Sequence, residues 1–240
     1  MESGSHGFQT TLWGVVRLAG EGASAASTVA LERLCKSYWY PLYAYLRRRG
    51  QSPHDAQDLI QGYFEQLLEK NLLQAVRQER GKFRWFLLST LRRFAANEWN
   101  RDHAAKRGGG MTMVSLDEET AEGRYRREIP DGATPETLYD RSWAMTLLER
   151  AEEELRLEYA QDGRGAMFER LKVFLSGDRD GASYAEVGAD LDMAEGAVKV
   201  AVHRLRRRFR DCLRRQIAQT VSTTAEVDDE IRQLFAVFGG

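Results

Sequence analysis

Residues 183–215 read SYAEVGADLDMAEGAVKVAVHRLRRRFRDCLRR, and this stretch decides the fold of the second half of the chain. Ser183 and Glu186 form the capping-box pattern of a helix start, and Asp192 stands where a turn needs a residue that tolerates the left-handed conformation. Apolar residues recur at helical spacing on both sides of that turn. The pattern predicts a helix-turn-helix, whose second helix enters the major groove of DNA. The residues expected to pack the pair are Ala185, Ala189, Leu191, Val198 and Leu205.

The second of these helices is strongly basic. Between Val198 and Gln216 there are eight basic residues and one acidic residue, a net charge of +7 in a chain whose total is −1. A segment of this kind attracts polyanions, which makes an ordinary helical hairpin with a solvated face the weaker interpretation. The candidate DNA contacts on it are Lys199, His203, Arg204, Arg206 and Arg207.

The rest of the chain is also helical in pattern. Its 240 residues, 42 % hydrophobic and 30 % charged, suffice for one or two folded domains. Period-two runs with hairpin turns are missing, so we expect an all-α protein of two small helical domains joined by a flexible linker. The expected segments are an N-terminal extension (1–28), a first domain (29–103), a linker (104–136) around Gly108–Gly110, a second domain (137–221) and an acidic helical extension (222–240).

Several classes of protein are excluded by composition and motif. No apolar run approaches the length of a membrane span, and Met1–Phe8 lacks the pattern of a secretory signal, so we expect a cytoplasmic protein. Cys35 and Cys212 lie too far apart in sequence for a CxxC metal site. Four scattered histidines and the lack of a hydrolase, zincin, Walker or dinucleotide motif indicate a protein that is not an enzyme and has no catalytic residue, metal or cofactor.

A second candidate nucleic-acid segment runs from Gly81 to Arg101 and mixes aromatic with basic residues. Such mixtures suit a single strand, because bases stack on rings while cations hold phosphates. Phe83, Phe86 and Phe94 fall on the core stripe, whereas Trp85 and Trp99 fall off it and are candidates for exposed contacts. The predicted DNA contacts here are Lys82, Arg84, Trp85, Arg92, Arg93, Asn97, Asn100 and Arg101.

A third pattern lies at DAQDLIQGYF, residues 55–64. Asp55, Asp58 and Gln61 are spaced by three and so share one helix face beside an apolar stripe. Spacing alone leaves two interpretations open, a solvated face and a protein-docking patch.

In this order, the three segments resemble the extracytoplasmic-function sigma factors of bacterial RNA polymerase. DAQDLIQGYF resembles the polymerase-docking helix of that family, FRWFLLSTLRRFAANEWNR (83–101) its promoter-melting segment, and YAEVGADLDMAEGAVKVAVHRLRRRF (184–209) its region-four helix-turn-helix. The resemblance implies core RNA polymerase and promoter DNA as partners. It assigns the minus-ten element to the first domain, the minus-thirty-five element to the second, and docking to Asp55, Asp58, Leu59, Gln61 and Phe64.

The chain also departs from the family pattern. Where the family has Thr-Val-Lys-Ser-Arg, residues 197–201 read Ala-Val-Lys-Val-Ala, so Lys199, His203 and Arg204 carry more of the DNA contact. Both ends extend beyond the small family core, which indicates a subgroup with its own control, by an anti-sigma factor, a protein kinase or the acidic tail itself. The alternative function is a helix-turn-helix regulator that binds DNA without polymerase.

Overall fold

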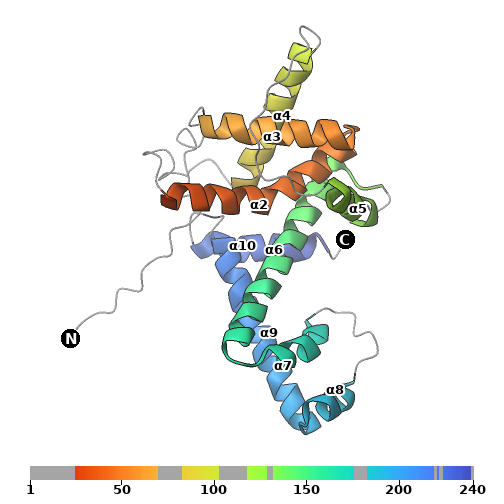
Figure 1. Ribbon diagram of the computed structural model, residues 1–240, viewed down its shortest axis with the longest axis vertical. Coiled ribbons are helices and arrows are strands. Elements are labelled where there is room, and N and C mark those ends of the chain that lie inside the picture. Colours follow the sequence, from red (N-terminus) through yellow and green to blue (C-terminus); the bar gives the residue numbers. More distant parts are fainter. Residues whose placement is uncertain are drawn as a thin grey trace, which may run out of the picture. The chain divides into compact units, whose positions relative to one another are not determined.

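The computed structural model describes residues 25–69, 83–102, 118–128, 132–175, 183–218, 221 and 224–238. Every regular element in these ranges is a helix, which confirms the predicted all-α class (Figure 1). The chain divides into two compact units: unit 1 is Met1–Thr146 with Ala218–Gly240, and unit 2 is Leu147–Ile217. Among the described helices, none has the length and apolar character to cross a membrane.

Unit 1 contains the helices α2 (Ala25–Arg48), α3 (Pro53–Glu69) and α4 (Phe83–Asp102). Beyond the end of α2, Gly50 takes a φ of +92°, a left-handed conformation that glycine adopts without steric cost. Ser52 then caps α3, since its Oγ accepts the backbone N–H of Asp55 at 3.1 Å. Aromatic side chains dominate the core of this unit, among them Tyr38, Tyr43, Tyr63, Phe64 and Phe83.

The predicted flexible linker, residues 104–136, contains a packed helix, so that prediction is wrong for α5 (Glu118–Glu128). Ala121 and Tyr125 of α5 are buried. The segment folds as a packed helix with few large apolar residues, because polar contacts bind α5 to α2. The remaining part of the predicted linker that precedes α5, with Gly108–Gly110, lies outside the described residues.

The main polar contact between α2 and α5 centres on the carboxylate of Glu122. It accepts hydrogen bonds from Arg47 Nε and from the Tyr43 hydroxyl, both at 2.8 Å. The Arg47 guanidinium holds the pKa of Glu122 at about 2, well below its usual range. A second bond runs from the Tyr40 hydroxyl to Glu128 at 2.8 Å. The contacts join residues 75 or more positions apart, which a local hydrophobic pattern does not reveal.

Unit 1 is completed by two segments that come later in the chain. The first is the beginning of α6 (Pro135–Gln161), which carries the buried Leu138, Tyr139 and Trp143. The second is α10 (Thr224–Ala236), the helix expected in the acidic extension. Val227, Glu230 and Leu234 of α10 are buried, and this acidic helix belongs to the same unit as α3 and α4.

Unit 2 comprises the remainder of α6 with α7 (Gly165–Leu171), the short 3-10 helix η2 (Lys172–Phe174), α8 (Tyr184–Leu191) and α9 (Glu195–Ala218) up to Ile217. Its core combines apolar faces of these helices. The Tyr159 and Phe168 rings pack at 5.6 Å between centroids, and the Phe174 and Tyr184 rings stack at 4.6 Å. Within this unit, α8 and α9 are the two helices of the predicted helix-turn-helix.

Candidate nucleic-acid and polymerase interfaces

Helix α3 carries the predicted docking face. Asp55 and Asp58 are exposed, while Leu59 and Gln61 are half-buried. Asp58 lies 3.5 Å from the imidazole of His54, an ion pair only when that imidazole is protonated. The exposed carboxylates on α3 are therefore accessible to a protein partner.

Phe64, the fifth predicted docking residue, is only 1 % exposed. Its ring packs against that of Tyr63 with centroids 5.6 Å apart. A side chain buried in this way supports the helix from inside and offers no surface to a partner, so the structure places Phe64 in the core rather than on the docking face.

Helix α4 has one outward stripe, and most of the described candidates lie on it. Trp85 is 41 % exposed, and Arg92, Arg93 and Asn97 are exposed as well. The opposite side of α4 is buried through Phe83, Leu87, Leu88, Leu91 and Phe94, which agrees with the predicted core stripe except that Phe86 is half-buried. Lys82 and the side chains of Trp99, Asn100 and Arg101 lie outside the described residues.

Arg84 differs from the other predicted contacts in α4, because it is only 3 % exposed. Its Nη1 lies 3.4 Å from the Glu230 carboxylate of α10 and 3.6 Å from the Asp140 carboxylate of α6. Its Nη2 donates to the side-chain oxygen of Gln233 at 2.6 Å, and its guanidinium lies 4.3 Å from the ring centroid of Trp143. The prediction that Arg84 contacts DNA does not fit this structure, in which α10 and α6 enclose the charge.

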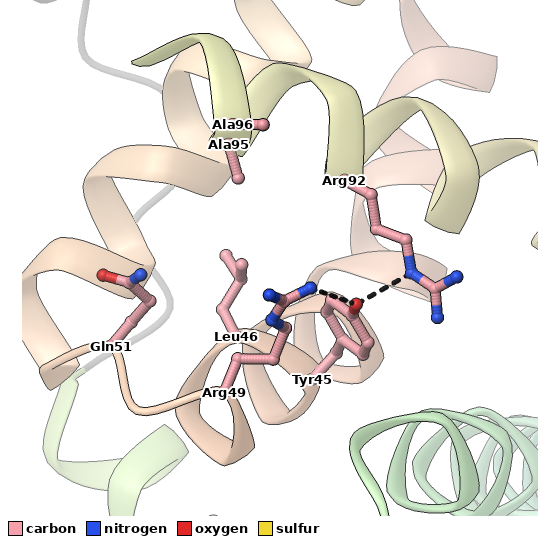
Figure 2. Close-up of a pocket in the computed structure, with 7 residues that line it drawn as sticks. All are labelled: Tyr45, Leu46, Arg49, Gln51, Arg92, Ala95 and Ala96. Carbon is pink, nitrogen blue, oxygen red and sulfur yellow. Dashed lines mark hydrogen bonds between the residues drawn. The ribbon is translucent and has the colours of Figure 1, made fainter. Parts of the chain in front are cut away.

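A pocket of about 410 Å³ opens between the end of α2 and the outward side of α4 (Figure 2). Two arginines share one acceptor in it: the Tyr45 hydroxyl accepts from Arg92 Nε at 2.8 Å and from Arg49 Nη1 at 3.2 Å. Glu136 of α6 pairs with Arg92. The other lining residues are Leu46, Gln51, Ala95 and Ala96. Arg49 was not among the predicted contacts, although the basic run at residues 47–49 was the signal that could have indicated it.

The turn between α8 and α9 has the geometry that the sequence predicts. Ser183 and Glu186 form the reciprocal capping box, and Asp192 adopts a φ of 53°. Gly188 lets the chain pass closely, because a Cβ there would lie 2.6 Å from the carbonyl oxygen of Met193. These contacts fix the short turn that sets the two helices at a defined angle.

The packing residues of the pair are only partly those predicted. Val198 and Leu205 are buried as expected, but Ala185 and Ala189 are exposed and Leu191 is half-buried. Val187 of α8 is buried, as the helical spacing predicts, and Gly188 beside it is buried as well. The ring of Tyr184 stacks on that of Phe174. The buried face of α9 is completed by Ala201, Val202, Cys212, Leu213 and Ile217.

The opposite side of α9 presents the predicted DNA contacts. Lys199, His203, Arg204, Arg206 and Arg207 are all exposed. Lys199 pairs with Glu195 at 2.7 Å, and Arg206 is anchored by two bonds to the Phe174 carbonyl, at 3.0 and 2.8 Å. Within the described ranges, His203, Arg204 and Arg207 form no hydrogen bond or ion pair, so their donors remain available for a ligand.

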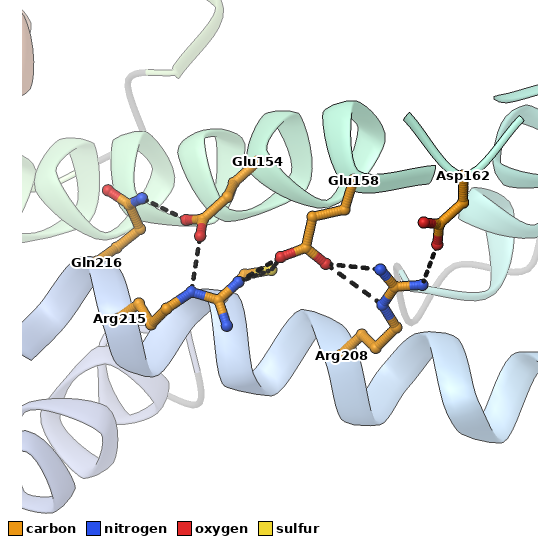
Figure 3. A network of polar contacts seen from close by, with 7 residues as sticks. Glu154, Glu158, Asp162, Arg208, Arg215 and Gln216 are labelled. Carbon is orange, nitrogen blue, oxygen red and sulfur yellow. Dashed lines mark hydrogen bonds and ion pairs between the residues drawn. The ribbon is translucent and has the colours of Figure 1, made fainter. Parts of the chain in front are cut away.

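Two further arginines of α9 belong to a structural network with α6 (Figure 3). Arg208 lies 3.0 Å from Glu158 and 3.3 Å from Asp162. Arg215 lies 2.7 Å from Glu154 and 2.6 Å from Glu158. The net charge of +7 therefore overstates the positive charge that α9 can present to a ligand. The spacing of four between the acids of α6 was the available sequence signal for this network.

The thiol of Cys212 lies in the same network, and burial raises its pKa to about 11. With the carboxylates of Glu154 and Glu158 it forms a cluster whose atoms lie within 4.8 Å of one another. Because Arg208 and Arg215 already pair with these carboxylates, the cluster is accounted for as an ion-pair network.

Comparison with known proteins gives one family. Residues 34–104, which include α3, α4 and most of α2, match the family described as sigma-70 region 2. Neither the curated proteins nor the solved structures compared with the chain give a match. The matched residues contain two of the three segments on which the resemblance rested. Residues 34–104 of the chain are therefore similar to sigma-70 region 2.

Proposed function

We propose that the chain is an extracytoplasmic-function sigma factor, which docks on core RNA polymerase and directs promoter recognition, DNA melting and transcription initiation. The observation that carries the proposal is the combination of a region 2 domain at residues 34–104 with a second unit whose α9 presents open cations. A sigma-70 region 2 domain implies interaction with core polymerase and promoter DNA, and supplies no catalytic group of its own. The polymerase performs the chemistry.

In this proposal, the exposed Asp55 and Asp58 of α3 dock on the polymerase, with Gln61 and Leu59 beside them. Complementary charge at such a rim position increases the association rate and selects the partner. The buried Phe64 keeps α3 rigid and does not touch the polymerase.

The outward stripe of α4 holds the unpaired strand of the minus-ten element. Trp85 offers a ring for base stacking, and Arg92, Arg93 and Asn97 offer donors to phosphates and base edges. Stacking contributes about 1–3 kcal/mol per base, which is comparable to the cost of extruding a base from the duplex. The pocket at Arg49 and Arg92 extends this cationic surface.

In this proposal, α8 and α9 recognise the upstream element. In a helix-turn-helix, the beginning of the second helix reaches base edges, while its later cations hold phosphates. Lys199, His203 and Arg204 occupy the first turns of α9, and Arg207 follows on the same side. We place the protein in the cytoplasm, with an anti-sigma factor or a protein kinase as candidate regulators.

The alternative is a regulator that binds duplex DNA without polymerase, as a dimer on a palindromic site. Gel-shift assays with and without core polymerase distinguish the two functions. A sigma factor binds promoter DNA tightly only in the presence of the polymerase, whereas the regulator binds equally well alone.

The decisive experiment is transcription in vitro with the full chain, core polymerase and a promoter library. We expect a discrete set of enriched promoters that share an upstream and a minus-ten element. In the same assay, the charge-reversed variant Asp58→Arg tests the docking face of α3. Glu152→Arg, at an exposed position of α6 in unit 2, is its matched control. Promoter-independent transcription, or none above the level of core polymerase alone, would contradict the proposal.

A further inference from the structure

An exposed valine lies on the side of α9 that carries the cations. Val200 is 51 % exposed, while the buried side of the helix consists of other residues, among them Val198, Val202 and Leu205. Residues three and four positions away share a helix face, and at Val200 these neighbours are Gly196, Ala197, His203 and Arg204, all exposed.

Folding does not explain Val200. A β-branched side chain loses rotamer freedom in a helix, and burial that could compensate for this loss is small at an exposed position. A single apolar side chain among cations is also not the extended apolar patch that marks a protein-protein interface. The surrounding charge selects a polyanion as the partner of this face.

The major groove of DNA contains one apolar group, the C5 methyl of thymine. It is the one alkyl group on the base edges of this groove, and apolar side chains are the ones that recognise thymine there. Val200 is the sixth residue of α9, and the first turns of a recognition helix are those that reach base edges. The side chain thus has the chemistry and the position for such a contact.

We infer that Val200 is a specificity-determining residue that contacts the C5 methyl group of one thymine in the upstream element. The inference rests on the proposed function of α9 and adds to it the identity of one base. Lys199 is held by Glu195, so the outer surface of the first three turns of α9 is shared by the methyl contact of Val200 and the hydrogen-bond donors of His203 and Arg204.

Replacing thymine by deoxyuridine tests the contact, because the change removes the methyl group and nothing else. The full chain with core polymerase is bound to a promoter from the library, and each thymine of the upstream element on either strand is replaced in turn. At one position we expect the affinity to fall about fourfold, the factor that corresponds to burying one methyl group.

The variant Val200→Ala identifies the protein side of the contact. We expect it to bind thymine and deoxyuridine promoters equally at that position, and to keep the wild-type response at all others. Leu157→Ala, at a 47 % exposed apolar residue of α6, is the matched control and should keep the fourfold ratio. Because Val200 is exposed and alanine is a better helix former, the variant should fold, which circular dichroism checks.

The outcomes separate this inference from the proposed function. A fourfold loss that persists in Val200→Ala, or no position sensitive to the methyl group, overturns the contact while leaving the sigma factor function in place. If the chain does not direct the polymerase to any upstream element, the proposed function fails and the methyl contact fails with it.

Discussion

Helices α4 and α9 both combine arginines with an apolar face, yet they use those arginines differently. In α4, Arg84 is enclosed by carboxylates of α6 and α10, whereas Arg93 is exposed and Arg92 is exposed even though it pairs with Glu136. In α9, Arg208 and Arg215 pair with acids of α6, whereas Arg204 and Arg207 are open. The comparison shows that the acids of distant segments decide which cations fold the protein and which remain for a ligand.

The largest effect is expected from breaking the enclosed pair of α4. Glu230→Ala leaves the Arg84 guanidinium buried without its α10 carboxylate, and removing one partner of a buried pair typically costs about 3–5 kcal/mol. We expect the free energy of unfolding in urea to fall by about 3 kcal/mol, since Asp140 and Gln233 still contact Arg84. Asp229→Ala, an exposed acid on the same helix, should change it by less than about 1 kcal/mol. Equal effects of the two substitutions would contradict a structural role of Arg84.

The next test compares the two kinds of arginine in α9, those that pair with acids of α6 and those that do not. Arg204→Ala should reduce promoter affinity of the holoenzyme: a lost guanine contact lowers discrimination by about 1–3 kcal/mol, and a lost phosphate contact reduces the log-log salt slope by about 0.9. Arg208→Ala should leave the salt slope unchanged and lower thermal stability instead. If Arg204→Ala alters neither affinity nor specificity, α9 does not read DNA through this residue.

A smaller effect is expected at Arg47 of α2, a cation that is paired with the carboxylate of Glu122. Glu122→Gln weakens the bonds to Arg47 and Tyr43 and should lower the free energy of unfolding by about 2 kcal/mol at neutral pH. The pKa of Glu122 is lowered to about 2 in the folded chain, so its contribution is complete above about pH 4.5 and is lost as the pH falls towards 2. Unfolding measured from pH 6 to pH 2 should therefore show a difference between wild type and variant that shrinks with acid. A difference independent of pH would rule out this linkage.

The smallest effect is expected at Asp58, an exposed acid of α3. Asp58→Arg reverses a charge on the surface of α3, and we expect the affinity for core polymerase to fall about tenfold by like-charge contact, with helicity unchanged. Co-purification and titration with core polymerase measure it. Undiminished binding would assign the docking face elsewhere on unit 1.

Local sequence signals predicted much of the fold and part of the site. The caps at Ser52 and Ser183, the left-handed Asp192 and the exposed Trp85 follow from short-range chemistry, and the structure agrees with each. The enclosure of Arg84 and the packing of α5 could not be predicted in this way. Both involve carboxylates, Glu230 and Glu122 among them, that contact their arginines across long stretches of chain.

The place of α10 in unit 1 has a consequence for synthesis on the ribosome. Unit 2 is encoded between two segments of unit 1, and 149 positions separate Arg84 from its α10 partner Gln233. At about 5–20 residues per second, roughly 7–30 s pass between the synthesis of these two residues. During that interval the earlier segments of unit 1 exist without α10, and the Arg84 guanidinium lacks its Glu230 partner. Helix α10, which is made after unit 2, therefore completes unit 1, and a product truncated before α10 lacks this contact.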